Sequence, residues 1–206
     1  MPEDFKERLE GLENIIHGVY HNVEILICLA IGLHKSKYGL HSNKGLLWIW
    51  SNTMAIQIID FYKLINAREK FSFRKIVNVA NNLKIKADYE KLEKEIDEII
   101  KIYTEQNYEA VRSKYLAHQD LNVPEIRTDL NGINQFSKKS IEIFQLFSEE
   151  FEFETKNFDK VIESSFEEIF ETIEKLEELN LLIFKKLFEN EETVEISELQ
   201  KIIDNA

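Results

Sequence analysis

Two side chains that could act together on a phosphodiester, Arg112 and His118, lie six residues apart in the chain. An arginine guanidinium is always charged, and its planar fork matches the geometry of a phosphate group. A histidine imidazole titrates near neutrality and can donate or accept a proton. Aimed at one RNA phosphodiester, the histidine would take the proton from the 2′-OH or protonate the leaving 5′-oxygen, while the guanidinium stabilises the charge on phosphorus. This chemistry needs no metal, and its 2′-OH nucleophile confines it to RNA.

The spacing of this pair does not suit one straight helix. Six residues of α-helix give a rotation of about 600° and a rise of about 9 Å, so the two side chains would not share a face. They converge if the helix ends near Ala117, which the following Asn122 and Pro124 favour. Alternatively, two copies of the chain bring them together across a two-fold axis.

The same residues also admit a purely structural interpretation. Arg112 would then form an ion pair with Asp120 or Asp60, and the pair would hold two helices together. His118 would lie at a helix C-terminus, where the helix dipole favours a cation. The two interpretations differ in whether Arg112 is available to a ligand.

The nine residues from Arg112 to Asp120 follow a fuller pattern, R-x-K-x-x-A-H-x-D, whose other members are Lys114, Ala117 and His118. The string resembles HEPN proteins of the abortive-infection type, and residues 58–64 and 71–76 are similar more loosely. The resemblance implies a core of four to five helices, dimerisation through the motif-bearing helices and a composite site. It also implies a metal-independent endoribonuclease, often a toxin or an antiphage effector.

Site residues follow from the resemblance position by position. Arg112 would hold the phosphate, His118 would be the general acid or base, and Ser113, Lys114 and Asp120 would support them or contact RNA. Active members commonly have Asn, Asp or His directly after the arginine, where this chain has Ser113. The alternative function is a non-catalytic module of the same fold that binds a nucleotide, RNA or protein. The expected partners are RNA, a second copy of the chain and a cognate antitoxin, with no cofactor or metal.

A metal site is the third hypothesis, and it rests on His17 and His21 one helical turn apart. Both imidazoles could hold one ion, but further ligands would have to arrive from elsewhere in the chain. The candidates for these further ligands are His34, His41 and Asp60. Cys28 lies inside an apolar run, so we expect it to be a small core residue rather than a reactive thiolate.

Composition predicts an all-α protein. The 206 residues are 44% hydrophobic and include only six glycines and two prolines, which removes the usual turns of β-rich folds. A single cysteine and an acidic N-terminus without an early apolar run favour a cytoplasmic location. The apolar stretches 25–33 and 46–65 read as buried helices, because one is too short for a membrane span and the other is interrupted by polar residues.

Charge is unevenly distributed along the chain. The net charge is −12, and residues 131–206 carry 19 acidic and eight basic residues. An acidic protein repels a polyanion at long range. Residues 63–86, however, hold seven bases and one acid, Glu69. This strip would either receive a phosphate backbone or form a solvated surface.

Hydrophobic spacing predicts an up-and-down helical bundle with a long C-terminal helix. A single HEPN-like domain would cover 1–190, and 191–206 would form a tail with a short helix. An irregular connection is expected over 119–134. We expect helices over about 3–36, 46–66, 72–83, 88–118, 135–154 and 158–189, with Ser72 and Asp88 as N-caps. The first range is either one long helix or two nearly continuous ones.

The last of these helices has a heptad-like apolar seam, in which Asn180 is the polar member. The seam either faces the core of the bundle or forms a dimer contact. Its members are Ile162, Phe166, Ile169, Ile173, Leu176, Asn180, Ile183 and Leu187.

Overall fold

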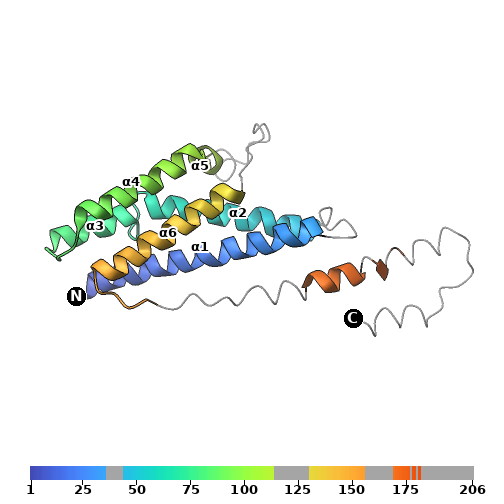
Figure 1. Cartoon of the computed structure of the whole chain (residues 1–206), viewed down its shortest axis with the longest axis horizontal. Coiled ribbons are helices and arrows are strands. Elements are labelled where there is room, and N and C mark those ends of the chain that lie inside the picture. Colours follow the sequence, from blue (N-terminus) through green and yellow to red (C-terminus); the bar gives the residue numbers. More distant parts are fainter. Residues whose placement is uncertain (36–43, 114–129, 156–168, 177, 180, 182–206) are drawn as a thin grey trace, which may run out of the picture. The chain divides into compact units, whose positions relative to one another are not determined.

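Every regular element that the computed structural model describes is a helix (Figure 1). The described residues are 1–35, 44–113, 130–155, 169–176, 178–179 and 181. The prediction of an all-α helical bundle is therefore confirmed. The named helices are α1 (Glu3–Lys35), α2 (Lys44–Ile65), α3 (Phe73–Asn82), α4 (Tyr89–Glu105), α5 (Tyr108–Val111) and α6 (Leu130–Glu150).

The chain divides into two compact units. The first comprises residues 1–26 and 51–159, and it contains most of α1 and α2 together with α3 to α6. The second comprises residues 27–50 and 160–206. Within the second unit Gly32 faces Phe170 so closely that a Cβ at position 32 would overlap the phenyl ring. The expected tail helix in 191–206 lies outside the described residues, so the domain boundary at 190 stays a prediction.

Two predicted N-caps are confirmed. The Ser72 hydroxyl accepts a hydrogen bond from the backbone N–H of Lys75 at 3.3 Å, and α3 begins directly after it. The Asp88 carboxylate accepts from the N–H of Lys91 at 3.1 Å at the start of α4. Each cap satisfies a backbone donor that the first helical turn leaves without an acceptor. Capping residues before an apolar run therefore located these two helix starts.

The helix expected to run from Asp88 to His118 is interrupted, and this prediction was wrong. α4 ends at Glu105, and Asn107 adopts a left-handed conformation with φ 55° before the short helix α5 begins. Asparagine tolerates this conformation better than most residues, which allows the chain to turn here.

α6 begins at Leu130, so the part of the expected irregular connection from 130 to 134 is helical instead. Asn131-Gly132, a turn signal in the sequence, lies inside the first turn of the helix. Gly132 is buried there because α6 approaches the α4–α5 corner closely. A Cβ on Gly132 would overlap the Gln106 side chain and lie 3.0 Å from the Tyr108 hydroxyl.

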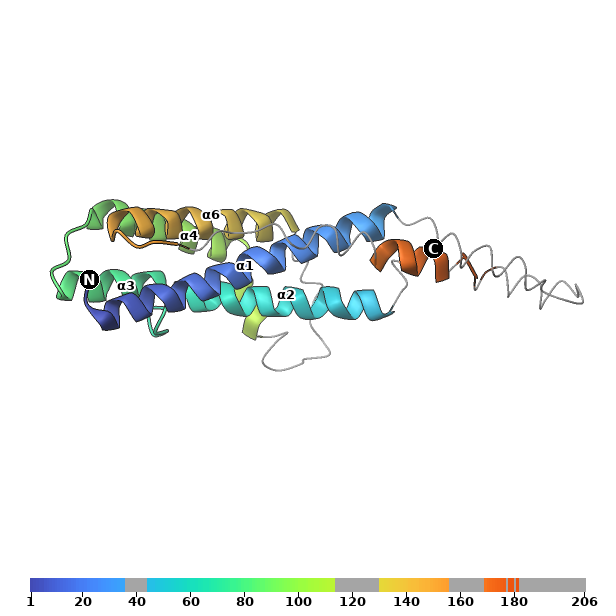
Figure 2. The same ribbon diagram turned by 90° about the horizontal axis from the view of Figure 1, so that it is seen from below.

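The first unit has its core between α1, α2, α4 and α6. α4 packs against α3 and α6, and the two views agree on α4 and α6 lying side by side (Figures 1 and 2). Aromatic rings fill two places along the core. One cluster is Phe5, Phe73, Phe147 and Phe151, and the other is Phe61, Tyr103, Tyr108 and Phe136.

α1 carries the one described stretch, Glu3–Gly32, that is long and apolar enough to cross a membrane by length and composition. Its apolar residues recur at steps of three and four, and the face that includes Leu9, Leu12 and Ile16 is fully buried in the first unit. A single buried face is the pattern of a core helix. The predicted cytoplasmic location remains a prediction.

The described residues of the last predicted helix, 169–176, 178–179 and 181, are helical. Two residues of its apolar seam are exposed, Ile169 to 44% and Leu176 to 54%. The seam residues 162, 166, 180, 183 and 187 lie outside the described residues.

Candidate functional site

Arg112 is positioned by a buried tyrosine four residues before it. Tyr108 opens α5 and is fully buried. Its ring centroid lies 5.4 Å from that of Phe61 on α2, 5.6 Å from that of Tyr103 on α4 and 6.2 Å from that of Phe136 on α6. Removing a large aromatic side chain from such a core costs about 3–5 kcal/mol of stability. The short helix α5 is therefore fixed to three longer helices by one side chain.

The same packing brings Arg112 onto α2. Phe61 is buried in the aromatic cluster, while its neighbour Tyr62 is half-buried because successive helical residues point about 100° apart. The Arg112 guanidinium carbon lies 4.0 Å from the centroid of the Tyr62 ring, over its face. Such a cation–π contact contributes about 0.5–1 kcal/mol at a partly exposed site. The contact joins residues 50 positions apart, and the Arg112 side chain keeps 28% exposure.

Glu109 binds one edge of this guanidinium. Arg112 Nε donates to Glu109 Oε2 at 3.2 Å, and Arg112 Nη2 donates to Oε1 at 2.7 Å. The Tyr103 hydroxyl donates to the same Oε2 at 3.2 Å, so the carboxylate is itself oriented by α4. The result is a chain of contacts from Tyr103 through Glu109 and Arg112 to Tyr62.

These contacts shift the pKa values of Glu109, Arg112 and Tyr103. The Arg112 hydrogen bond lowers the pKa of Glu109 below its ordinary 4.5, against a smaller opposing effect of burial. The Glu109 hydrogen bond raises the pKa of Arg112. Burial, followed by the charge of Glu109, raises the pKa of Tyr103 far above its ordinary value. The pair is therefore ionised and Tyr103 is neutral over the whole physiological range.

Of the five predicted site residues, the structure describes Arg112 and Ser113. The chain stays helical through Ser113, whose hydroxyl donates to the Ala110 carbonyl at 3.5 Å. Lys114, His118 and Asp120 lie outside the described residues, as does the predicted end of the helix near Ala117. The proximity of Arg112 and His118 thus stays a prediction.

The proposed ion pair between Arg112 and Asp60 was wrong. Asp60 accepts a hydrogen bond from Lys63 at 2.8 Å, one helical turn away, and Arg112 pairs with Glu109. The Glu109–Arg112 spacing of three residues is a helical ion-pair signal that the sequence does contain. The sequence contains no comparable signal for the contact between Arg112 and Tyr62, because the two residues lie 50 positions apart.

The described residues offer no support for the metal hypothesis. The imidazole rings of His17 and His21 stack with centroids 6.0 Å apart. No group of three or more His, Cys, Asp or Glu among the described residues is arranged to hold a metal ion. The His34 side chain and all of His41 lie outside that part of the chain.

The basic strip of residues 63–86 is partly neutralised by acids. Lys70 pairs with Glu7 at 2.7 Å, Arg74 pairs with Asp97, and Lys63 pairs with Asp60. The first two pairs join separate segments of the chain, and the third lies within α2. Bases paired in this way are less available to a polyanion. The strip is better explained by its solvated, ion-paired surface than as a phosphate track.

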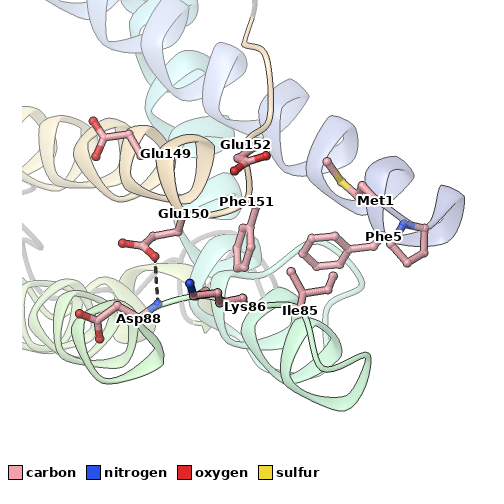
Figure 3. Close-up of a pocket in the computed structure, with 11 residues that line it drawn as sticks. Met1, Phe5, Ile85, Lys86, Asp88, Glu149, Glu150, Phe151 and Glu152 are labelled. Carbon is pink, nitrogen blue, oxygen red and sulfur yellow. Dashed lines mark hydrogen bonds between the residues drawn. The ribbon is translucent and has the colours of Figure 1, made fainter.

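A cavity of about 850 Å³ lies near the start of α4 and the end of α6 (Figure 3). Phe5, Ile85 and Phe151 supply apolar surface, and the carboxylates there outnumber the single lysine. Glu150 accepts a hydrogen bond from the Asp88 backbone N–H at 2.9 Å, so this acid ties α6 to α4 (Figure 3). An acidic rim repels phosphate, which leaves Arg112 as the better candidate for an anionic ligand.

Comparison with known proteins assigns no family. No protein-family model, curated protein or solved structure matches this chain. The candidate site therefore stands on its own residues and geometry.

The Glu109–Arg112 pair predicts a measurable pH response. Because the pKa of Glu109 is lowered on folding, the pair stabilises the folded state above pH 4.5, and this stabilisation is lost as pH falls through the folded-state pKa. We expect an NMR titration of the Glu109 side-chain carboxyl to give a midpoint below 4.5. Arg112→Ala should raise that midpoint more than Tyr103→Phe does, because the Arg112 hydrogen bond is the larger cause. A midpoint unmoved by Arg112→Ala would contradict the described pairing.

Proposed function

We propose that the chain is a metal-independent endoribonuclease of the HEPN type, acting as a toxin or an antiphage effector. The observation that carries the proposal is the presentation of Arg112: its guanidinium rests on the Tyr62 ring and keeps an exposed fraction while one edge is held by Glu109. A partly exposed, oriented arginine is suited to bidentate phosphate binding. The string from Arg112 to Asp120 adds the imidazole that cleavage requires.

The proposed reaction is an internal transesterification. The 2′-oxygen bonds to the adjacent phosphorus, the bond from phosphorus to the 5′-oxygen breaks, and the products carry a 2′,3′-cyclic phosphate and a 5′-OH. The 2′-OH loses its proton and the leaving 5′-oxygen gains one. His118 carries out one of these two transfers, and water carries out the other. Arg112 donates to the phosphate oxygens on which charge grows.

A second copy of the chain would complete this site. The helical offset between Arg112 and His118 favours catalytic groups drawn from two chains. Ile56 and Ile59 of α2 are 51% and 38% exposed and lie at steps of three before Tyr62. This apolar strip, defined by Ile56 and Ile59, continues to the ring that carries Arg112. Burying the strip against its own copy would place two Arg112 side chains at one interface.

The runner-up is a non-catalytic module that binds RNA, a nucleotide or a protein such as an antitoxin through the same surface. Ser113 favours the binding module, because active members of the family that the chain resembles commonly have Asn, Asp or His at that position. Both functions use Arg112 to hold an anion. They differ in whether bound RNA is cut.

Cleavage in the presence of EDTA tests the proposal. We expect the purified protein to cut structured RNA and leave 2′,3′-cyclic phosphate ends, because the proposed chemistry uses the substrate's 2′-OH and no metal. His118→Ala and Arg112→Ala should each lower the rate about 100-fold or more. The measurement is single-turnover cleavage of end-labelled RNA.

Arg68→Ala is the matched control, because Arg68 is an exposed arginine with no ion pair among the described residues. It should cleave at the wild-type rate. RNA that stays intact with the wild type but is bound in an Arg112-dependent way would contradict the nuclease and support the binding module.

The dimer is tested by mass in solution. We expect a two-chain mass at micromolar concentration, measured by analytical ultracentrifugation, and a one-chain mass for the double variant Ile56→Glu, Ile59→Glu, because charges would replace the apolar strip. Leu83→Glu changes an apolar residue of similar exposure, 45%, at the end of α3 and should leave the dimer intact. A wild-type chain that sediments as a monomer would contradict the composite site.

A further inference from the structure

Glu109 occupies one edge of the Arg112 guanidinium and leaves the other edge without an acceptor among the described residues. A guanidinium has five N–H groups. Two of them, one on Nε and one on Nη2, donate to Glu109. The three others, two on Nη1 and one on Nη2, have no acceptor among the described residues. The Nη1–Nη2 edge can therefore still form a two-pronged contact with a phosphate.

Tyr62 and Tyr103 further restrict the Arg112 and Glu109 side chains. One face of the guanidinium lies on the Tyr62 ring at 4.0 Å, which limits rotation about the long side chain. The carboxylate of Glu109 is fixed in turn by the Tyr103 hydroxyl at 3.2 Å. An arginine that is ordered before binding loses less conformational entropy when it meets its ligand.

A carboxylate beside a phosphate site has two opposing effects. Its charge repels the incoming phosphate, and its hydrogen bonds orient the arginine that attracts it. Because Glu109 uses the Nε–Nη2 edge and leaves the Nη1–Nη2 edge open, it does not occupy the position that a bidentate phosphate would take. This geometry favours the orienting effect.

We propose that Glu109 is a positioning residue that holds Arg112 by its Nε–Nη2 edge so that the Nη1–Nη2 edge binds an RNA phosphodiester. The proposal rests on the proposed function for the identity of the anion. Glu109 lies outside the string from Arg112 to Asp120. Tyr62 and Tyr103 help to position Arg112 in the same way, through the ring contact and the hydrogen bond to Glu109. Glu109 acts through Arg112 and does not touch the phosphate.

The test measures binding without cleavage. The probe is a fluorescent 2′-O-methyl oligouridine, which lacks the nucleophilic 2′-OH and has no base that titrates in mild acid. Its anisotropy in EDTA gives Kd for the wild type, Arg112→Ala, Glu109→Ala and Glu109→Gln. The control is Glu105→Gln, which removes the same charge four residues earlier, at the exposed end of α4. Thermal unfolding of each variant shows whether the fold is kept.

We expect Arg112→Ala and Glu109→Ala to weaken binding about tenfold. Glu109→Gln should recover part of the loss, because an amide oxygen still accepts one hydrogen bond from Arg112. Glu105→Gln should bind as the wild type does or slightly more tightly, since only a repelling charge is lost. Wild-type binding should also weaken as pH falls below 4.5, because Glu109 becomes protonated. Glu109→Gln should lack this pH dependence, because its amide does not titrate. The charged or titratable groups at Glu109 are Arg112 and Tyr103, and Tyr62 acts on Arg112.

Two results would overturn the assignment. If Glu109→Ala binds as tightly as the wild type, or more tightly, while Arg112→Ala weakens binding, Glu109 is neutral or a competitor and the proposed phosphate contact still stands. If Arg112→Ala binds as well as the wild type, Arg112 is not the phosphate ligand and the positioning role fails with it. Absence of cleavage together with Glu109-dependent binding would refute the nuclease alone.

Discussion

The candidate site depends on the burial of one tyrosine. Tyr108 opens a four-residue helix that is too short to be stable by itself, and its fully buried ring contacts α2, α4 and α6 at once. Two local features make room for it. The left-handed Asn107 turns the chain out of α4, and Gly132 lets α6 approach the corner. Without the tyrosine anchor, Arg112 would be on a frayed end rather than over the Tyr62 ring.

The site also shows how an acidic protein can offer a phosphate a favourable contact. The chain has a net charge of −12, and the basic residues 63, 70 and 74 are used in ion pairs. The net charge therefore repels a polyanion at long range, and recognition has to come from geometry at short range. A guanidinium held by Glu109 and Tyr62 supplies such geometry, because little side-chain order remains to be gained on binding.

Features of the fold that depend on neighbouring residues in the sequence were predicted well, and features that depend on tertiary contacts were missed. Capping residues Ser72 and Asp88 located the starts of α3 and α4, and the three-to-four residue spacing of apolar side chains indicated the helices, since these rules act within a few residues. The start of α6 at Leu130 was missed because Asn131-Gly132 is a turn signal. The break at Asn107 was missed because the apolar pattern continues across it from Tyr103 to Tyr108 and Val111. Its cause, the aromatic cluster around Tyr108, joins positions 61, 103, 108 and 136 and has no local signature.

The candidate site was predictable to the same extent. Residue type and spacing identify Arg112 in the sequence. Its partner Glu109 lies three residues before it, which is a spacing typical of helical ion pairs. The proposed pairing with Asp60 failed because a lysine one turn away on the same helix satisfies that acid. Tyr62 required knowledge of how α5 packs on α2, which depends on the tertiary structure. The contribution of His118 remains a prediction from the sequence.

Buried Tyr108 orders the Arg112 guanidinium, and NMR relaxation of the Arg112 Nε–H group measures this order directly. In the wild type we expect an order parameter near that of rigid backbone, about 0.85, and a proton resonance shifted by the Tyr62 ring. In Tyr108→Leu, with the helical fold retained by circular dichroism, the order parameter should fall below about 0.6 and the ring shift should disappear. An Arg112 side chain that is already flexible in the wild type, or equally rigid in Tyr108→Leu, would contradict the account.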